Sequence, residues 1–336
     1  MPALVSLIIL NYNASRFVDR LVSSLLKQTY RPLEVIVFDN NSSDDSALKY
    51  QKLESSFDKF LLIRHDQNAG FARANNLAMQ RARGKYLFFL NCDLWLAPDA
   101  VELLVARAEQ SAPNSILAPR QRTYDDRQDL NCGLGLDIFG FPVPLTPGVP
   151  LFYADGAALF LERTLFSKLG QFDEDTFFTS EDVGLSWRAR LAGHQILPVP
   201  EAKVYHWSGG ILSGGAARTT EYITSAKRRF YTEKNILRNL LIHYKFSTRL
   251  WLMPLYFFWQ AGECLGSLIL LGWAAAAVYP RSWAWNWRQR RSILAWRQKV
   301  AQLRQINDRD LMKYMVWRNS KLQRLRQVGR PRLKSS

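Results

Sequence analysis

Polar side chains follow three apolar runs of this sequence, each at the point where the run ends. In chain order they are Asn11 and Asn13, then Asp39, then Asn91 and Asp93. Ligands of open α/β sheets bind outside the carboxyl ends of the strands, where a carboxylate can hold a divalent cation and, through it, a phosphate. We therefore expect Asp93 to bind a metal ion and Asp39 to bind a nucleobase or ribose. The alternative is that each acid only caps the helix that follows it.

Phosphate binding in this chain needs a cation or side chains, because the common glycine-rich phosphate loops are missing. Neither GxGxxG nor GxxxxGK[ST] occurs, which excludes a dinucleotide fingerprint and a P-loop. Arg73 lies in the first turn of a predicted helix and could reach a phosphate or the nucleobase. A solvated helix arginine explains the same spacing equally well.

Four apolar runs are predicted as β-strands. They cover residues 4–10, 33–38, 60–63 and 86–90, and they are rich in Val, Ile, Leu and Phe without clean alternation. That composition is typical of strands covered on both faces.

The segments between these runs are predicted as helices. One has an apolar stripe from Phe17 to Leu26, and another covers Phe71 to Ala82 with Gly84 placed to end it. A third begins at a cap formed by Ser42 and Ser43, with Asp44 and Asp45 in its first turn. The alternation predicts an α/β fold with a Rossmann-like, mostly parallel, doubly wound sheet.

Charge is distributed unevenly along the 336 residues. Residues 281–336 hold 16 Lys and Arg against two Asp, a net charge of +14, whereas residues 1–280 have a net charge of +2. Three scattered cysteines, Cys92, Cys132 and Cys264, argue against a disulfide framework or a zinc site and fit a reducing compartment. The first residues lack a basic segment and their apolar run is short for a signal peptide, so we expect cytoplasmic synthesis without export.

An apolar stretch, residues 250–279, contains Glu263 as its single charged residue. It is long enough to cross a bilayer, which takes about 20 residues, although a re-entrant or in-plane pair of helices is equally compatible with its Pro254 and Gln260. Trp and Arg interleave after it, as expected at the cytoplasmic surface of a membrane with anionic lipid. The alternatives are RNA binding, which the apolar stretch disfavours, and a buried core or dimer interface.

Motifs in a fixed order make the sequence resemble a known family. The order is NYN after the first strand, then VIVFDNNSSD, NAGFARANN, YLFFLNCD, FYADGAALF, TSEDVGLSWRARLAGH and VYHWSGG. This order resembles the family 2 glycosyltransferases, in particular the rhamnosyltransferase-like branch that builds bacterial surface polysaccharides, over roughly residues 4–245. The resemblance implies a GT-A fold, a nucleotide diphosphate sugar donor, a divalent cation (Mn²⁺ or Mg²⁺) and an inverting transfer to a hydroxyl group.

The resemblance also implies roles for single residues. Asp39 matches the acid that contacts the nucleoside, Asp93 the last acid of the metal-binding strand end, and His206 a late histidine that completes the metal site. Glu181 and Asp182 match the pair that supplies the catalytic base, with Asp182 favoured as the base. The residues expected to bind the nucleotide sugar are Asn11, Asn13, Asp39, Asn68, Gly70, Arg73, Asn75, Asn91, Gly156 and Ala157.

Two further expectations concern these motifs. The branch has proline where this chain has Cys92, and we expect the cysteine to be structural. Ser180 is predicted to cap the helix that Glu181 and Asp182 open. Because the N-terminal end of a helix lowers the pKa of a carboxylate, we expect Asp182 to stay ionised. The alternative is that both acids only complement the helix dipole.

Three segments are predicted: a GT-A glycosyltransferase domain (1–245), membrane-associating helices (246–280) and a basic, Trp- and Arg-rich helical tail (281–336). The expected activity is transfer of rhamnose or a similar sugar from a dTDP- or UDP-linked donor to a lipid-linked or surface-polysaccharide acceptor, at the cytoplasmic face of a bacterial inner membrane. A sugar nucleotidyltransferase would share the sheet but needs a glycine-rich loop where this chain reads NYNASRF. A membrane-associated, non-enzymatic nucleic-acid-binding or scaffold protein is the other alternative.

Overall fold

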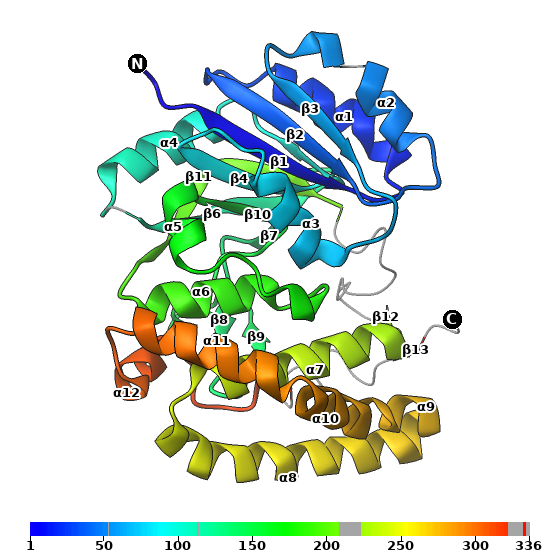
Figure 1. The fold of residues 1–336 in the computed structure, drawn as a ribbon, viewed down its shortest axis with the longest axis vertical. Helices are drawn as coiled ribbons and strands as arrows, with labels where there is room; N and C mark the ends of the chain where they lie inside the picture. The colour runs from blue at the N-terminus through cyan, green and yellow to red at the C-terminus, as the bar shows by residue number, and fades with distance from the viewer. Residues whose placement is uncertain (53, 113, 208–222, 322–331, 334–336) are drawn as a thin grey trace. The chain divides into compact units, whose positions relative to one another are not determined.

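The structure is a computed structural model that describes residues 1–336 except 53, 113, 208–222, 322–331 and 334–336. It forms two compact units, neither of which is continuous in sequence (Figure 1). Unit 1 comprises Met1–Leu134, Leu151–Arg190 and His194–Ile211, and unit 2 comprises Gly135–Pro150, Leu191–Gly193 and Leu212–Ser336. The boundaries expected at residues 245 and 280 both fall inside unit 2, and the functional division that they express stays a prediction.

The first half of the unit 1 sheet is parallel. Its strands are β1 (Val5–Asn11), β2 (Leu33–Asp39), β3 (Phe60–Arg64) and β4 (Tyr86–Asn91), in the order β3-β2-β1-β4. All four correspond to predicted strands. Every residue of β1 is buried, which fits a strand covered on both faces. The register places Asn11 opposite Asp39, so the first two polar strand ends are neighbours.

The second half of the sheet is mixed. β10 (Ala158–Glu162) runs antiparallel to β4 and to β6 (Ile116–Thr123), and β11 (Ile196–His206) is parallel to β6. β5 (Leu94–Leu96) and β7 (Asp129–Asn131) add antiparallel edges. The α/β class is confirmed, but the expectation of a mostly parallel sheet is wrong for this half. As a result the N-terminal end of β10 meets the C-terminal end of β4.

The helices of unit 1 largely follow the predicted pattern. α1 (Ser15–Leu26) buries its predicted stripe from Phe17 to Leu25 and leaves Leu26 at the surface. The other elements are α2 (Ser46–Lys52), α3 (Gly70–Met79), α4 (Ala100–Gln110), α5 (Arg163–Lys168), α6 (Glu181–Leu191) and the short turns Glu54–Ser56 and Glu174–Thr176.

Two predicted helix boundaries are wrong. α2 begins at Ser46, and Asp44 lies before it, where its carboxylate accepts the N–H groups of Ser46 (3.0 Å) and Ser15 (2.9 Å). α3 ends at Met79, so Gly84 does not end it. Gly84 instead allows two segments to approach closely, because a Cβ there would lie 2.5 Å from Ser6 Oγ.

Unit 2 is built mainly from helices. They are α7 (Ala226–His243), α8 (Phe246–Leu271), α9 (Trp273–Ala276), α10 (Val278–Arg288), α11 (Arg290–Leu303), α12 (Asp308–Leu311) and the turn Met312–Tyr314. Two small sheets pair β8 (Gly135–Leu136) with β9 (Pro142–Val143) and β12 (Ile223–Thr224) with β13 (Arg332–Leu333). Within the described residues, no helix combines the length and the apolar character that crossing a membrane requires.

Candidate active site

The ends of β1 and β2 place Asn11 beside Asp39. Asn11 Nδ2 donates to Asp39 Oδ1 at 2.7 Å, and Ser42 Oγ donates to the same oxygen at 2.5 Å. Asn11 has no exposed surface, and its Oδ1 has no hydrogen-bond partner among the described residues. Asn13 Oδ1 accepts the N–H of Ser43 at 2.7 Å and so fixes the loop that follows β2. In this structure Asn11 and Asn13 orient Asp39 and its loop.

Asparagine side chains join the end of β2 to the start of α3. Asn40 Nδ2 donates to Asn68 Oδ1 at 3.1 Å. Gly70 opens α3 with a φ of +78°, and a Cβ on it would lie 2.5 Å from the Phe177 ring, so a side chain there would be strained. The Phe177 carbonyl accepts the N–H of the residue after Gly70 at 2.5 Å. The NAGF motif therefore docks α3 onto the segment that precedes α6.

Arg73 and Asn75 make structural contacts on α3. The Arg73 side chain is 54% exposed, and its Nε lies 4.0 Å from Glu174 Oε2. Asn75 is buried, and its Nδ2 donates to the carbonyl of Phe71 in its own helix at 3.0 Å. The donor-binding role of both residues stays a prediction.

The predicted metal ligands meet where β4 and β11 end. His206 Nε2 lies 3.1 Å from Asp93 Oδ1, and His206 Nδ1 lies 3.1 Å from Gln121 Oε1 on β6. Metal-binding histidines commonly have this arrangement, in which an oxygen holds one ring nitrogen and orients the other. Among the described residues, no group of three or more His, Cys, Asp and Glu side chains could hold a metal ion.

Burial and the nearby acids shift the pKa of His206 in opposite directions. Burial lowers the pKa of His206, but the hydrogen bond to Asp93 and the charges of Asp93 and Asp155 outweigh it, so the pKa is raised. Cys92 is buried, and burial together with the charge of Asp93 raises the pKa of its thiol to about 12. A buried, neutral thiol fits the structural role expected for Cys92.

A turn formed by Asp155, Gly156 and Ala157 links two parts of the site. The Ala157 carbonyl accepts the N–H of Asn91 at 2.9 Å, which ties the turn to the end of β4. The N–H of Gly156 donates to Asp182 Oδ2 at 2.8 Å, which ties the turn to the start of α6. A Cβ on Gly156 would lie 3.2 Å from the Cβ of Asp182, so the contact favours glycine. Four predicted site residues thus form one connected group.

Asp182 holds its proton more tightly than expected. Burial and the charge of Asp155 raise the pKa of Asp182 to about 7, although its carboxylate accepts the N–H groups of Gly156 and Val183. The expectation that the helix end keeps this pKa low is wrong, because desolvation and a like charge outweigh the dipole and the hydrogen bonds. A carboxylate with a pKa near neutral is suited to act as a general base.

The segment that leads into α6 has an unusual backbone. Phe177, Thr179 and Ser180 have φ angles of 66°, 68° and 63°, which residues other than glycine rarely adopt. Ser180 therefore lacks the extended backbone that is usual at a helix cap. Glu181, the first residue of α6, is buried. Backbone strain of this kind is common at functional sites.

Several contributors to the site were not predicted. Asn40 and Ser42 belong to the motif VIVFDNNSSD, and Asp155 belongs to FYADGAALF, so the quoted motifs contained the signal. Gln121 lies inside β6 and no pattern in the sequence marked it.

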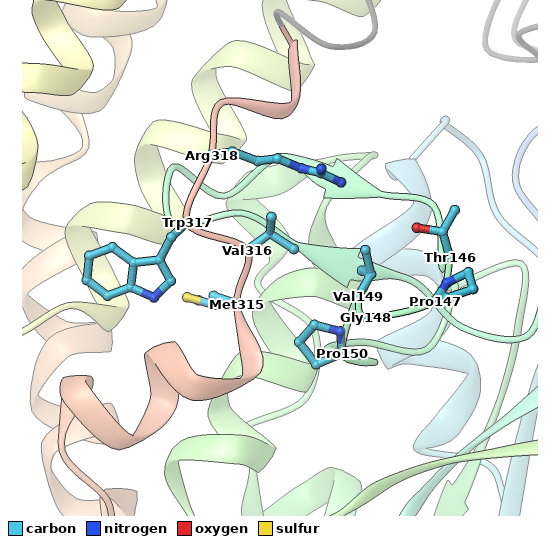
Figure 2. Close-up of a pocket in the computed structure, with 9 residues that line it drawn as sticks. All are labelled: Thr146, Pro147, Gly148, Val149, Pro150, Met315, Val316, Trp317 and Arg318. Carbon is cyan, nitrogen blue, oxygen red and sulfur yellow. The ribbon is translucent and has the colours of Figure 1, made fainter.

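A pocket of about 320 Å³ lies within unit 2 (Figure 2). It is lined by residues 146–150 and 315–318. None of the predicted site residues lines it, so it is separate from the candidate active site.

Unit 1 is thus an α/β domain with an acid-rich site at one edge of its sheet. The sequence model of the family "Glycosyl transferase family 2" matches residues 6–169, which is just under half of the chain. The predicted resemblance to the family 2 glycosyltransferases is confirmed, and the rhamnosyltransferase-like branch stays a prediction.

One relative is UDP-Glc:alpha-D-GlcNAc-diphosphoundecaprenol beta-1,3-glucosyltransferase WfgD of Escherichia coli, which is 32% identical over 165 residues. The match covers 41% of this chain and 64% of WfgD, so the chain spans less than two thirds of that relative.

Solved structures are similar in fold. GalNAc-T7 with UDP, GalNAc and Mn²⁺ has a TM-score of 0.57 at 19% identity, over 71% of this chain and 48% of that chain. Mannosyltransferase PcManGT from Pyrobaculum calidifontis, in complex with GDP-Man and Mn²⁺, has a TM-score of 0.51 at 16% identity, over 90% of this chain and 86% of that chain. The chain is therefore similar to family 2 glycosyltransferases over residues 6–169, and its fold is GT-A-like.

Proposed function

We propose that this protein transfers a sugar, with inversion, from a nucleotide diphosphate sugar to a hydroxyl group of a lipid-linked or surface-polysaccharide acceptor. The observation that carries the proposal is the connected group at the sheet edge. There the turn at Gly156 joins the end of β4, which bears Asp93, to the Asp182 carboxylate. Such a group supplies both needs of the reaction: a place for the diphosphate and a base for the acceptor.

Asp39 is proposed to hold the nucleoside. Asn11 and Ser42 each donate to its Oδ1, which fixes the carboxylate so that it can accept hydrogen bonds from a ribose or nucleobase. The name of the relative WfgD specifies UDP-Glc as donor, which supports a UDP-linked sugar. The rhamnosyltransferase-like motifs support dTDP-rhamnose or a similar sugar.

The Asp93 and His206 side chains fit a divalent cation. A carboxylate and an imidazole form a donor set that suits Mn²⁺, and Gln121 orients the ring of His206. The solved relatives with Mn²⁺ support the same ion. A cation bound there would neutralise the negative charge that develops on the leaving diphosphate. Two protein ligands make a weak site, so we expect the phosphates of the donor to complete it.

Asp182 is proposed to remove the proton of the acceptor hydroxyl as that oxygen attacks the sugar. With a pKa of about 7, Asp182 is partly ionised at neutral pH and is basic enough to accept this proton. Direct attack by the acceptor, with no covalent intermediate on the protein, inverts the configuration at the sugar. Glu181 is the alternative base.

The acceptor is proposed to be lipid-linked, because the name of WfgD specifies a diphosphoundecaprenol acceptor. We infer a location at the cytoplasmic face of a bacterial inner membrane, either peripheral or through the segment after residue 245. The basic residues 281–336 support attraction to anionic lipid.

The test is nucleotide release from dTDP-rhamnose, UDP-glucose and UDP-N-acetylglucosamine, with Mn²⁺ or Mg²⁺ and a lipid-diphosphate acceptor. Asp93→Ala is expected to abolish release, whereas Asp99→Asn, which changes an exposed acid directly before α4, should not. A metal-independent Asp93→Ala enzyme with unchanged activity would contradict the proposal. The anomeric configuration of the product, read by NMR, tests inversion.

A further inference from the structure

The outer face of α8 (Phe246–Leu271) consists of apolar residues. Every exposed residue between Leu250 and Leu270 lacks a polar side chain, and exposure reaches 83% for Phe258 and 73% for Ile269. The exposed positions recur every three or four residues, so they form one stripe along the helix. The most exposed members of this outer stripe are Leu250, Leu255, Phe258, Leu265 and Ile269.

The opposite face of α8 is buried and partly polar. Glu263 on this face lies 2.7 Å from Lys321 Nζ, which lies equally close to Glu233 of α7. Gln260 Nε2 donates to the second oxygen of Glu233 at 2.9 Å. Buried positions run from Thr248 to Ser267, so α8 rests on the rest of unit 2 along most of its length. In Figure 1, α9 and α10 lie along one side of α8.

This polarity is the reverse of that of a helix on a water-exposed surface, whose apolar residues face the core. The stripe extends along a helix of 26 residues, which is about 39 Å long. Leaving such a surface in water is unfavourable, and a bilayer would cover it. We propose that α8 docks the protein side-on onto an anionic membrane, with the outer stripe inserted among the acyl chains of one leaflet. Docking would give the site access to a lipid-linked acceptor, and in this respect the inference rests on the proposed function.

Charges and aromatic rings of α10, which packs against α8, and of α11, which follows it, favour an anionic lipid surface over a second copy of this chain. Trp283 of α10 packs against Phe257 of α8, with ring centroids 4.9 Å apart. Trp287, farther along α10, is exposed, and Arg290 lies 5.5 Å from its ring. Tryptophan favours the headgroup level and cations attract acidic headgroups, whereas a dimer would bring like charges together. The exposed cations of α10 and α11 are Arg281, Arg288, Arg290, Arg291 and Lys299.

The experiment is co-sedimentation of the full chain with vesicles of equal parts phosphatidylglycerol and phosphatidylcholine. The triple variant Leu255→Ser/Phe258→Ser/Ile269→Ser is expected to bind at least about tenfold more weakly than the unmodified chain, because each substitution removes a buried apolar side chain from the lipid contact. The matched control Leu26→Ser/Leu48→Ser/Leu130→Ser removes exposed leucines from unit 1 and should bind as before. Vesicles of phosphatidylcholine alone should bind the unmodified chain more weakly.

Two measurements keep this test separate from that of the proposed function. Transfer to a water-soluble acceptor should be the same for the outer-stripe variant, the control and the unmodified chain, so that lost membrane binding and lost catalysis are distinguishable. Sedimentation velocity without lipid tests the alternative that the outer stripe binds a second copy of this chain. Unchanged vesicle binding by the outer-stripe variant overturns the inference, and so does a change from dimer to monomer without a change in lipid binding.

Orientation is tested with a polarity-sensitive fluorophore on a single cysteine at Leu250, Phe258 or Leu265, in a background of Cys132→Ser and Cys264→Ser. Cys92 is buried and its thiol stays neutral, so it should not react. Side-on docking predicts equal quenching of the three probes by a lipid that carries a quencher at one depth. Quenching that changes steadily from Leu250 to Leu265 contradicts side-on docking. If vesicles change the fluorescence of none of the three probes, the result contradicts membrane binding.

Discussion

Both units of this protein bury charged groups, but they arrange them in opposite ways. In unit 2, Lys321 lies 2.7 Å from Glu233 and from Glu263, so that the two carboxylates share one cation. In unit 1, acids gather at one edge of the sheet, and the charge of Asp155 helps to raise the pKa of both Asp182 and His206. In the first cluster each acid lies beside a lysine, whereas in the second the neighbouring acid Asp155 raises the pKa of Asp182.

We interpret the difference as that between a structural cluster in unit 2 and the proposed catalytic cluster in unit 1. A paired buried charge holds elements together, and removing one partner is costly because the other charge stays buried. An excess of buried acid lowers stability when all groups are ionised, and such sites persist where protons or cations are handled. Substitutions in the unit 1 cluster should therefore change activity more than stability, and substitutions in the unit 2 cluster should do the reverse.

The largest effect on activity in this comparison is expected for Asp182→Asn. Loss of the base should lower the transfer rate by a factor on the order of 10²–10⁴, measured as nucleotide release at saturating donor. Glu181→Gln is the matched change one residue earlier and should have the smaller effect. If Glu181→Gln is the more damaging change, the two acids exchange roles.

The pH dependence of stability provides a second test of Asp182→Asn. Because the pKa of Asp182 is raised to about 7, the folded chain binds this proton more tightly than the unfolded chain, and stability falls as the pH rises toward neutral. An asparagine side chain cannot ionise. The melting temperature of Asp182→Asn relative to the unmodified protein should therefore increase with pH, while activity stays low. A relative stability that does not change with pH would contradict the raised pKa.

Lys321→Met should have a large effect on stability. It leaves the carboxylates of Glu233 and Glu263 buried without their shared cation, which should cost about 3–5 kcal/mol in the free energy of unfolding. Lys313→Met is the control: Lys313 also lies 2.7 Å from an acid, Asp310, but its side chain is 70% exposed. Exposed pairs contribute little to stability, so urea unfolding should barely change. Equal losses in the two variants would contradict the distinction between the clusters.

The sequence was sufficient to predict the strands that end at Asn11, Asp39 and Asn91. Long runs such as residues 86–90 are apolar because both faces of the strand are buried, so their ends can be located from composition alone. The Asp93 and His206 pair was predicted from the family motifs, although 113 residues separate the two side chains.

The direction of β10 could not be read from the same pattern. The four apolar residues of β10 (158–161) do not indicate in which direction the strand runs, and only the fold shows that β10 starts where β4 ends. Asp155 was therefore not recognised as an acid of the site. The protonation of Asp182 was mispredicted for a related reason, because burial and the neighbour Asp155 are properties of the folded chain.

Gln121→Ala tests the proposed cation site at Asp93 and His206, and its effect on activity is expected to be intermediate. Gln121 is buried and holds His206 Nδ1, so its loss should raise the Mn²⁺ concentration for half-maximal activity by about 10–100-fold and leave the rate at saturating metal nearly unchanged. Gln28→Ala removes another buried glutamine of unit 1, whose Nε2 donates to the carbonyl of Ala97 at 2.8 Å. The control should lose stability without a change in metal dependence. If the metal dependence of the Gln121→Ala enzyme is unchanged, the result contradicts the proposal that His206 binds the cation.

The smallest effect is expected for Asp155→Asn, and it concerns the pH profile. If Asp182 acts as a base, transfer rises with pH as this carboxyl loses its proton and levels off above its pKa of about 7. Removing the neighbouring negative charge lowers that pKa, so the ascending limb should move to lower pH, and activity on the acid side should rise by at most about tenfold.

The turn should persist, because the Ala157 N–H donates to Asp155 Oδ1 at 2.9 Å and the substituted amide keeps an oxygen for it. Glu201→Gln, an exposed acid on β11, should leave the limb in place. Activity lost at every pH would instead mean that Asp155 acts directly on the donor or the cation, and the excess of acid would then bind the substrate rather than tune the base.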